Sequence, residues 1–383
     1  MVKPQRAKER LQISTIEREA DFAVLREPWN SLLKRSTADT IFLTWEWLYT
    51  WWQHFGAGRQ LSIMLVRYGD EIVGIAPFCY QTIRIRGILP LRSLQWLGTG
   101  AVGSDYLSLI ATPEYEKEVC DLVCYQLTRC ADQWDLLRLT DLLDNSRIYQ
   151  RLCELLGQNR ELEWQPGREY ICPYIQLADH CWDSYQAMLS ANMRYNLRRC
   201  TKQVFQYLGG ELVSCQWLQD VKPRLDQIFE LHQRRWSLQG GSDGFTGQHI
   251  QAFHHTVAER LFQCGWLRLY LLEIDHRTVA GIYGFEYGGV FSFYQSGFDP
   301  ELNRYSVGTV LLGQTIKQAL ANRLMMYDFL HGAEEYKFRW TQTVRHTHSL
   351  LVYPRQRLRP KLYCWLRKLK ARLINLDNKE NKE

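Results

Sequence analysis

The chain has 383 residues, a net charge of +6, 46% hydrophobic residues and 13% aromatic residues. This length suffices for two ordinary domains with a large buried core. No apolar run approaches the roughly eighteen residues of a membrane span. The charged N-terminus MVKPQRAKERLQ is not followed by the apolar stretch of a signal peptide. We therefore expect a globular protein in the cytoplasm.

Most of the positive charge lies at the C-terminal end. Residues 354–383 hold ten Lys/Arg and three Asp/Glu, a net of +7, so the rest of the chain is about −1. A nucleic-acid surface would spread basic residues over the folded body, so we expect no DNA partner. The 11 cysteines form no C-x-x-C pair, which predicts reduced thiols and neither a disulfide framework nor a metal site.

The first half of the chain alternates helical and strand-like segments. Residues 23–33 and 44–55 predict helices, the second of which contains the core-type run WEWLYTWW. Residues 65–78 predict a β-hairpin around a Gly69-Asp70 turn. The segments that follow are predicted as strand 106–111, helix 114–131 and strand 135–142.

GTGAVG, at residues 98–103, has the G-x-G-x-x-G spacing of a dinucleotide-binding loop. Such a loop needs a helix directly after the glycines, so that the pyrophosphate meets the helix N-terminus. Here the glycines run into SDYLSLIA, which predicts another strand. We therefore interpret GTGAVG as a flexible turn joining two strands, and not as a nicotinamide or flavin site.

The second half repeats the order of the first. At an offset of 207 the hairpins 65–78 and 272–285 share four residues, which are Leu65/Leu272, Gly74/Gly281, Ile75/Ile282 and Phe78/Phe285. The other predicted segments are helices 224–236, 248–263 and 307–323 and strands 290–298 and 325–332. We infer two copies of one α/β module, with a long helix over 182–208 between them.

The start of the helix at 307–323 is the best candidate anion site. A strand end passes through a polar loop into this helix, with Ser306 near the cap and Gly308 in the first turn. Unpaired backbone N–H groups and a glycine that permits close approach suit a pyrophosphate, although an ordinary capped helix has the same pattern. The matching segment 111–123 has three carboxylates in its first turn, which would repel a phosphate.

These features resemble the GNAT superfamily, and within it the bacterial double-module group related to Fem-type transferases. The likeness is greatest to the BioF2-like acetyltransferases, which include proteins attached to cellulose and exopolysaccharide synthesis. It covers roughly residues 12–353, and its carriers are FLTWEWLYTWW (42–52), SDYLSL (104–109), MRYNLRR (193–199), LHQRRW (231–236), GFDPELNRYSVGTVLL (297–312) and DFLHGAEEYKFRW (328–340).

The resemblance implies a mixed α/β fold of two tandem GNAT-like modules, each a mixed central sheet flanked by helices. The expected organisation is a disordered N-terminus (1–10), a degenerate first module (11–175), a connecting helix (176–210), a second module with the acyl-donor site (211–353) and a basic amphipathic tail (354–383).

The implied activity is transfer of an acyl group from acyl-CoA, first of all acetyl-CoA, to an amine or hydroxyl of a sugar or cell-envelope precursor. The family loop Q/R-x-x-G-x-G/A corresponds here to Tyr305, Ser306, Val307, Gly308, Thr309 and Val310. It keeps one glycine, but Tyr stands first and Val last. Fem-type relatives use aminoacyl-tRNA with a similarly degraded loop, so this donor is one alternative. A catalytically silent partner of a polysaccharide assembly machine is another.

Acyl transfer needs a base for the acceptor, an acid for the leaving thiolate and N–H groups that polarise the carbonyl. In GNAT folds the donor lies between two splayed parallel strands, here 290–298 and 325–332. Residues just after the second strand can therefore face the site. Glu334 or His331 is the expected base and Tyr336 the candidate acid. His232 is a further candidate base, or else a satisfied core histidine.

Several residues are expected to hold substrate. Arg194 and Arg198 lie one helical turn apart, which suits recognition of phosphate or uronate, or salt links between the modules. The other expected substrate-binding residues are Asp105, Tyr106 and Lys337. GGSDG (240–244) is expected to form a mobile loop beside the cleft.

The tail has leucines on one helical face and Lys/Arg elsewhere. These leucines are Leu362, Leu366, Leu369 and Leu373. A basic amphipathic helix of this kind lies on an anionic membrane surface, or packs its leucines onto the second module. Both arrangements stay open at this point.

Overall fold

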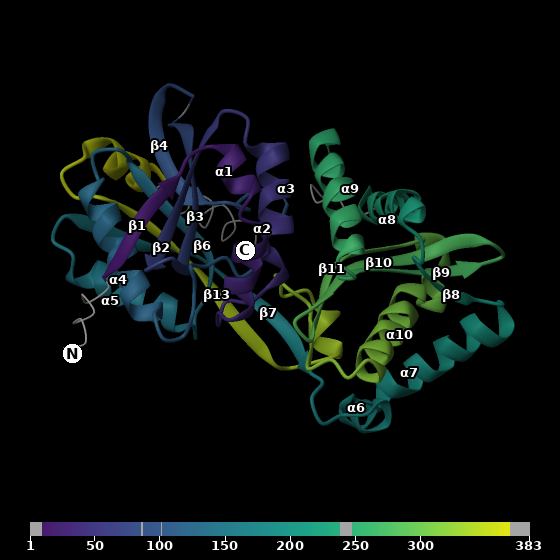
Figure 1. The fold of residues 1–383 in the computed structure, drawn as a ribbon. Helices are drawn as coiled ribbons and strands as arrows, with labels where there is room; N and C mark the ends of the chain where they lie inside the picture. The colour runs from purple at the N-terminus through teal and green to yellow at the C-terminus, as the bar shows by residue number, and fades with distance from the viewer. Residues whose placement is uncertain (1–9, 86, 101, 238–246, 368–383) are drawn as a thin grey trace, which may run out of the picture.

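The computed structural model describes residues 10–85, 87–100, 102–237 and 247–367. Figure 1 shows two sheet-centred halves with helices on their faces, joined by long strands that run from one half to the other. The predicted mixed α/β fold is confirmed. Among the residues described, no helix is both long and apolar enough to cross a bilayer.

Among the described residues, the first half contains five α-helices and six strands, with a seventh strand leading out of it. The helices are α1 (Glu19–Ala23), α2 (Arg26–Lys34), α3 (Trp45–Phe55), α4 (Glu116–Arg129) and α5 (Arg147–Gln158). The strands are β1 (Leu11–Ile16), β2 (Arg59–Tyr68), β3 (Glu71–Ile85), β4 (Leu89–Trp96), β5 (Ile110–Ala111), β6 (Leu136–Leu143) and the outgoing β7 (Leu162–Gln176).

The second half has a similar composition. Its helices are α6 (Trp182–Met188), α7 (Ala191–Lys202), α8 (Leu218–Ser237), α9 (Gln248–Gln263) and α10 (Val307–Ala321). Its strands are β8 (Glu211–Ser214), β9 (Leu267–Ile274), β10 (Arg277–Tyr287), β11 (Val290–Phe298), β12 (Met326–Asp328) and the returning β13 (Val344–Pro354). Residues 358–367 form a further helix.

The internal repeat is visible in the strand pairing. In the first half the antiparallel hairpin β2–β3 is followed by β4, which pairs in parallel with β6, the strand after α4. In the second half the antiparallel hairpin β9–β10 is followed by β11, which pairs in parallel with β12, the strand after α10. The strand after the first hairpin is thus β4, and the predicted strand 106–111 pairs only at Ile110 and Ala111.

The residue offset of 207 is wrong by one. The Gly69-Asp70 turn corresponds to Asp275-His276, and the bulged residues Val73 and Val279 also lie 206 apart. A slip of one residue reverses which face of a strand each side chain occupies. Accordingly Gly74 faces Val119 of α4, whereas Gly281 faces Ile228 of α8.

The two halves exchange strands. β13 pairs with β6 on one side and with β7 on the other, from Val344 opposite Pro173 to Pro354 opposite Leu162. β7 in turn pairs with β12. The result is one continuous sheet in the order β1-β2-β3-β4-β6-β13-β7-β12-β11-β10-β9-β8. Each half therefore completes its sheet with a strand that the chain supplies from the other side.

The predicted long helix over 182–208 is broken. α6 ends before Leu189, and the Ser190 side chain accepts a hydrogen bond from the Met193 N–H at 3.2 Å, which caps the start of α7. After α7, residues Gln203–Tyr207 widen into a π-helical turn. A serine cap within an apolar-periodic segment starts a new helix, because it satisfies backbone N–H groups that a continuous helix would pair internally.

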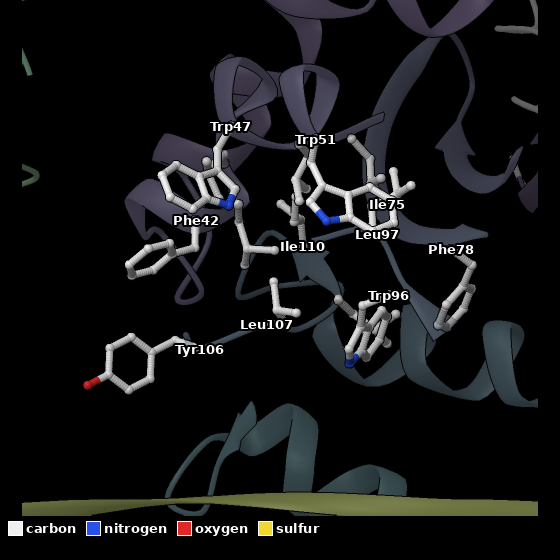
Figure 2. Packing of buried hydrophobic residues seen from close by; sticks show 14 of the residues in the cluster. Phe42, Trp47, Trp51, Ile75, Phe78, Trp96, Leu97, Tyr106, Leu107 and Ile110 are labelled. Atoms are coloured by element: carbon white, nitrogen blue, oxygen red, sulfur yellow. The ribbon is translucent and has the colours of Figure 1, made fainter. Parts of the chain in front are cut away.

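One apolar core runs through both halves. Trp47 of α3 packs edge-on against Phe253 of α9 and Phe285 of β10, with ring centroids 5.3 and 5.5 Å away. Its indole N–H donates to Ser104 Oγ at 2.8 Å. Figure 2 shows Trp47 beside Phe42. Tyr106, from the loop after β4, points its hydroxyl away from the cluster. The run WEWLYTWW is therefore core, as predicted.

A buried polar network lies where the exchanged strands cross. Arg345 of β13 pairs with Asp328 at the end of β12, and the Tyr106 hydroxyl donates to Asp328 at 3.1 Å. The Arg345 guanidinium also donates to the Tyr106 hydroxyl at 3.1 Å and lies over that ring. A carboxylate that is 1% exposed needs such partners, because burial without them is costly.

We predict that Arg345→Met lowers the free energy of unfolding by about 3 kcal/mol, because Asp328 then keeps a buried charge without its cation. Arg35→Met is the matched control, since the Arg35–Glu71 pair at 2.7 Å is about half exposed on both sides. That change should cost no more than about 0.5 kcal/mol. Urea unfolding measures both values, and equal losses in the two variants would contradict this view of the network.

Candidate active site

Two parallel strands of the second half separate toward one end. β11 and β12 pair only from Val290–Met326 to Ser292–Asp328, although β11 continues to Phe298. A β-bulge follows the last paired residue, because Tyr283 pairs with Gln295 and Gly284 with Phe293, which leaves Tyr294 as the extra residue. Bulges re-aim side chains and often lie next to active sites. The widening leaves a gap that begins at Phe293.

The start of α10 faces this gap. Ser306 before the helix has a φ of 52°, a left-handed conformation that costs free energy in a residue other than glycine. The Phe298 ring lies 3.0 Å from where a Gly308 Cβ would be. A cavity of about 240 Å³ opens here, lined among others by Ser306, Val307, Gly308, Thr309, Gly297, Phe293, Arg235, Arg339 and Tyr336.

A larger cavity adjoins the first and shares Ser306, Thr309 and Arg339 with it. Its volume is about 1070 Å³, and it lies between α7 and the start of α10. Polar side chains line much of it, including Asn192, Asn196 and Arg199 of α7. The two cavities form an elongated cleft, which we call the donor cleft because the expected donor-loop residues Ser306 to Thr309 lie on its wall. Helix N–H groups, which favour anions, stand at its middle, with guanidinium groups nearby.

A third cavity of about 240 Å³ lies on the seam between the halves. It shares Phe293 and Tyr336 with the donor cleft, so these two side chains separate the two spaces. The first half contributes Val102, Gly103 and Asp105, from the loop that begins with GTGAVG. The residues after β12 contribute His331, Glu334 and Lys337. We call this space the seam cavity.

His331 is held between two carboxylates of the first half. Its Nδ1 lies 3.0 Å from Asp105 Oδ1, and its Nε2 lies 3.4 Å from Asp141 Oδ1. Burial lowers the pKa of His331, but Asp105 first of all, then Cys172 and Asp141, outweigh it and raise the pKa to about 11. Burial also raises the pKa of Asp141 to about 6. At neutral pH the imidazole is therefore a cation, with no lone pair to accept a proton.

Three residues that follow His331 in the chain, Glu334, Tyr336 and Lys337, also line the seam cavity. Lys337 is 3% exposed and donates to the His331 and Gly332 carbonyls at 2.6 and 3.2 Å, which fixes this loop. Its ammonium lies 2.8 Å from Glu334 Oε2, and Glu334 is half exposed. Burial, reinforced by Glu334, raises the pKa of Tyr336, so its phenol keeps its proton.

Four predicted residues lie outside these cavities. His232 is buried behind β11 with its Nδ1 3.2 Å from the Ser296 carbonyl oxygen, and burial lowers its pKa. Arg194 donates to the Ala187 and Leu189 carbonyls at the end of α6, while Arg198 is exposed. Tyr305 packs under Arg304, with the guanidinium 4.7 Å from the ring centroid. None of the four is among the residues that line the cavities described here.

Tyr106 is the remaining predicted substrate-binding residue, and it lies in the buried network with Asp328 and Arg345 and not on the cavity wall. The expected mobile loop at 240–244 lies outside the described residues. Within the predicted set, the structure thus brings together Asp105, His331, Glu334, Tyr336 and Lys337 at the seam, and Ser306 to Thr309 at the donor cleft.

Three arginines line the donor cleft, Arg199, Arg235 and Arg339. Arg199 belongs to the MRYNLRR cluster that was expected to bind substrate, whereas Arg235 and Arg339 were not predicted as site residues. The last two lie in the blocks LHQRRW and DFLHGAEEYKFRW, so the signal was present. The Asp141 carboxylate was also missed. It has a φ of 63° within a strand, a conformation that no local pattern in DLLRLTDL announces.

The corresponding helix start in the first half carries acidic side chains. α4 begins with Glu116 and Glu118 in its first turn, two of the three predicted carboxylates, and Glu116 is 4% exposed with Thr37 as hydrogen-bond partner. A protein carboxylate thus already stands at the helix N-terminus, where an anion would bind. In the second half, by contrast, the start of α10 carries no acidic residue and borders the donor cleft.

Residues 191–338 match the family described as Acetyltransferase (GNAT) domain. A search of curated proteins finds no match. Among solved structures, FemX has a TM-score of 0.60 at 11% identity, over 92% of this chain and 99% of that chain. A conserved protein of unknown function from Bacteroides thetaiotaomicron VPI-5482 has a TM-score of 0.54 at 13% identity, over 89% of this chain and 99% of the other.

These likenesses fit the geometry of the second half: the split parallel strands, the bulge in β11 and the acid-free start of α10 next to a cleft. At such low sequence identity these structures show the shared fold alone. The family match includes Ser306 to Thr309 of the donor cleft, while Arg339 lies one residue beyond it. Residues 191–338 of the chain are therefore similar to a GNAT acetyltransferase domain.

Proposed function

We propose that the protein is a BioF2-like acyltransferase, which transfers an acetyl group from acetyl-CoA to an amine or hydroxyl of a sugar or cell-envelope precursor. One observation carries this proposal. The donor cleft and the seam cavity meet at Phe293 and Tyr336, so that a donor and an acceptor bound in them would face each other across two side chains.

The donor cleft has the chemistry that acyl-CoA requires. The narrow part is lined by Phe293, Phe298 and Leu312 and suits a thin chain, while the wider part is polar. Between them the start of α10, with Arg339 beside it, suits a pyrophosphate. Acyl-CoA would supply the activated thioester. The Tyr and Val that replace the usual ends of the loop leave Ser306 to Thr309 on the cleft wall.

Glu334 and Tyr336, where the donor cleft meets the seam cavity, each carry out one of the two proton transfers of the reaction. Glu334 faces the seam cavity and accepts the proton of the acceptor nucleophile. Tyr336 lines both spaces and keeps its proton at neutral pH, so it donates to the departing thiolate. Because His331 is already a cation, we assign it to holding the acceptor and not to the role of base. Lys337 holds the loop that presents all three.

A second candidate function is transfer from aminoacyl-tRNA. It is favoured by the exposed face of α7 next to the wider cavity, where Arg198, Arg199 and Lys202 alternate with exposed aromatic residues. Tyr195 and Tyr207 are 67% and 69% exposed, and the Lys202 ammonium lies 5.6 Å from the Tyr207 ring centroid. Basic and aromatic side chains in alternation suit a single-stranded RNA end.

We predict that acetyl-CoA at a hundred times its Kd stabilises the wild type by about 2.7 kcal/mol and raises its Tm by a few degrees. Gly308→Glu should abolish the shift, because it puts a side chain and a negative charge at the helix N-terminus. The control is Gly157→Glu in α5, where a Cβ meets open space. Thermal unfolding with several acyl-CoAs measures this.

The outcomes separate the candidates. A shift in the wild type and in Gly157→Glu, but not in Gly308→Glu, supports the donor site. A shift with aminoacylated tRNA and none with any acyl-CoA would replace the proposal by the second candidate. No response to either donor would favour the hypothesis that the protein is a non-catalytic partner of a polysaccharide synthase.

We predict that Tyr336→Phe lowers kcat about 100-fold or more with little change in the KM for the donor, because it removes a proton donor and keeps the ring. Tyr305→Phe is the control and should retain activity, since Tyr305 does not line the cavities. Steady-state assays of thiol release measure both. A variant of Tyr336 with wild-type kcat would remove this residue from the mechanism.

We predict that the stabilisation contributed by His331 falls as the pH rises above about 6.5. The folded pKa of about 11 lies above the ordinary value of 6.5, so the unfolded chain loses the proton first. The difference in unfolding free energy between the wild type and His331→Gln should therefore shrink by up to about 1.4 kcal/mol per pH unit.

Urea unfolding from about pH 6.5 to 9.5 tests this trend, above the range in which Asp141 titrates. His54→Gln is the control, because burial lowers the pKa of His54 and it stays neutral over the same range. A constant difference for His331→Gln would mean that the imidazole is not charged, and would make it eligible as the base.

A further inference from the structure

The C-terminal helix, residues 358–367, has two apolar faces. One face packs on the first half, where the 4% exposed Cys364 and the half-buried Tyr363 and Leu366 contact Ile85, Leu91, Leu136 and Leu351. The expectation that the tail packs onto the second module is therefore wrong. The leucines expected in one stripe also separate, because Leu366 is packed and Leu362 is exposed; Leu369 and Leu373 lie outside the described residues.

Ion pairs hold this helix in a fixed orientation. Arg357 pairs with Asp135 at 2.7 Å, and it lies just before the first turn. Arg355 and Lys361 both approach Glu163, at 3.7 and 3.6 Å. The helix therefore presents a defined outer face.

That outer face is apolar. Leu358, Leu362 and Trp365 are 80%, 45% and 57% exposed. Their spacing of four and three residues places them in a row along one side of the helix. The hairpin whose stem packs on the same helix ends in Ile88, which is 82% exposed. Large apolar side chains gathered at one end of a molecule mark a contact with another apolar phase.

Cations flank the row. Arg359 and Arg367 are exposed on the helix, Arg355 is half exposed before it, and Arg84 is exposed on the hairpin. The last thirty residues have ten Lys/Arg against three Asp/Glu, while the rest of the chain is nearly neutral. Leucine, isoleucine and tryptophan enter the headgroup boundary of a bilayer, and arginine and lysine pair with its anionic lipids.

We propose that the outer face of the C-terminal helix, with the Ile88 hairpin tip, docks the protein on the surface of an anionic lipid bilayer. The site is distinct from the active site. Leu136 begins β6 and Asp141 lies toward its other end, about 17 Å away along the strand, so the docked end and the seam cavity are well separated. The proposal does not depend on the identity of the donor or acceptor.

Vesicle sedimentation of the full chain tests the proposal. The wild type should bind vesicles containing about 30% phosphatidylglycerol and bind pure phosphatidylcholine vesicles at least about tenfold more weakly. Raising NaCl from about 0.1 to about 0.5 M should weaken the binding several-fold, because salt screens the charges. Equal binding to both lipid compositions, or no binding to either, would overturn the proposal.

The variant Leu362→Asp/Trp365→Asp should reduce the partition coefficient about tenfold or more, because it replaces the inserted side chains by anions. The chain offers a matched control on another surface, Trp217→Asp/Leu218→Asp, whose wild-type residues are 67% and 42% exposed. The control should bind like the wild type, and both variants should unfold at the wild-type temperature and keep the activity. Equal losses in the two variants would overturn the proposal.

Two further readouts distinguish other occupants of this face. Lipids with brominated acyl chains should quench part of the tryptophan fluorescence of the wild type and less of that of Trp365→Phe, which still docks. Unchanged quenching in Trp365→Phe would place Trp365 outside the bilayer and overturn the proposal. So would light scattering that finds a dimer for the wild type and a monomer for Leu362→Asp/Trp365→Asp, since the face would then join two copies of the chain.

Discussion

The exchange of β7 and β13 is the constraint on which the rest of the structure depends. Because β13 completes the sheet of the first half and β7 that of the second, the halves are fixed at one register along eleven residues of β13. This register places Arg345 against Asp328 and brings Asp105 and Asp141 within reach of His331. The seam cavity exists because both halves build it, and neither could form it alone.

The two halves have similar arrangements of strands and helices, but the start of the long helix differs between them. In both halves a long helix follows the strand that later pairs in parallel, so each presents a helix start at the same place. In the first half Glu116 occupies that place and Val119 fills the space above Gly74. In the second half Gly308 leaves it open. The first half instead contributes Val102, Gly103 and Asp105 to the seam cavity, which adjoins the cleft of the second half.

The sequence predicted the parts of this structure that depend on neighbouring residues. Periodicity located α9 and α10 to within two residues, and the turn residues located both hairpins. The sequence analysis did not predict β7 or β13. β7 contains Pro166 and Gly167, which are unusual within a strand, and both strands pair with partners that are distant in the sequence. The same holds for the site. Glu334 and Tyr336 follow a recognisable strand, whereas the ionised state of His331 depends on Asp105 and Asp141, more than 180 residues earlier.

The position of the docking helix follows from the same exchanged strand. β13 passes Thr347 beside His331 and continues to Leu351, on which the C-terminal helix packs, before the chain turns into that helix. One strand thus connects the seam cavity with the apolar outer face. The Arg357–Asp135 pair and the contacts of Cys364 fix the helix to the far end of the first half's sheet. A bilayer held there lies at the opposite end of β6 from Asp141, so it leaves the seam open to an acceptor.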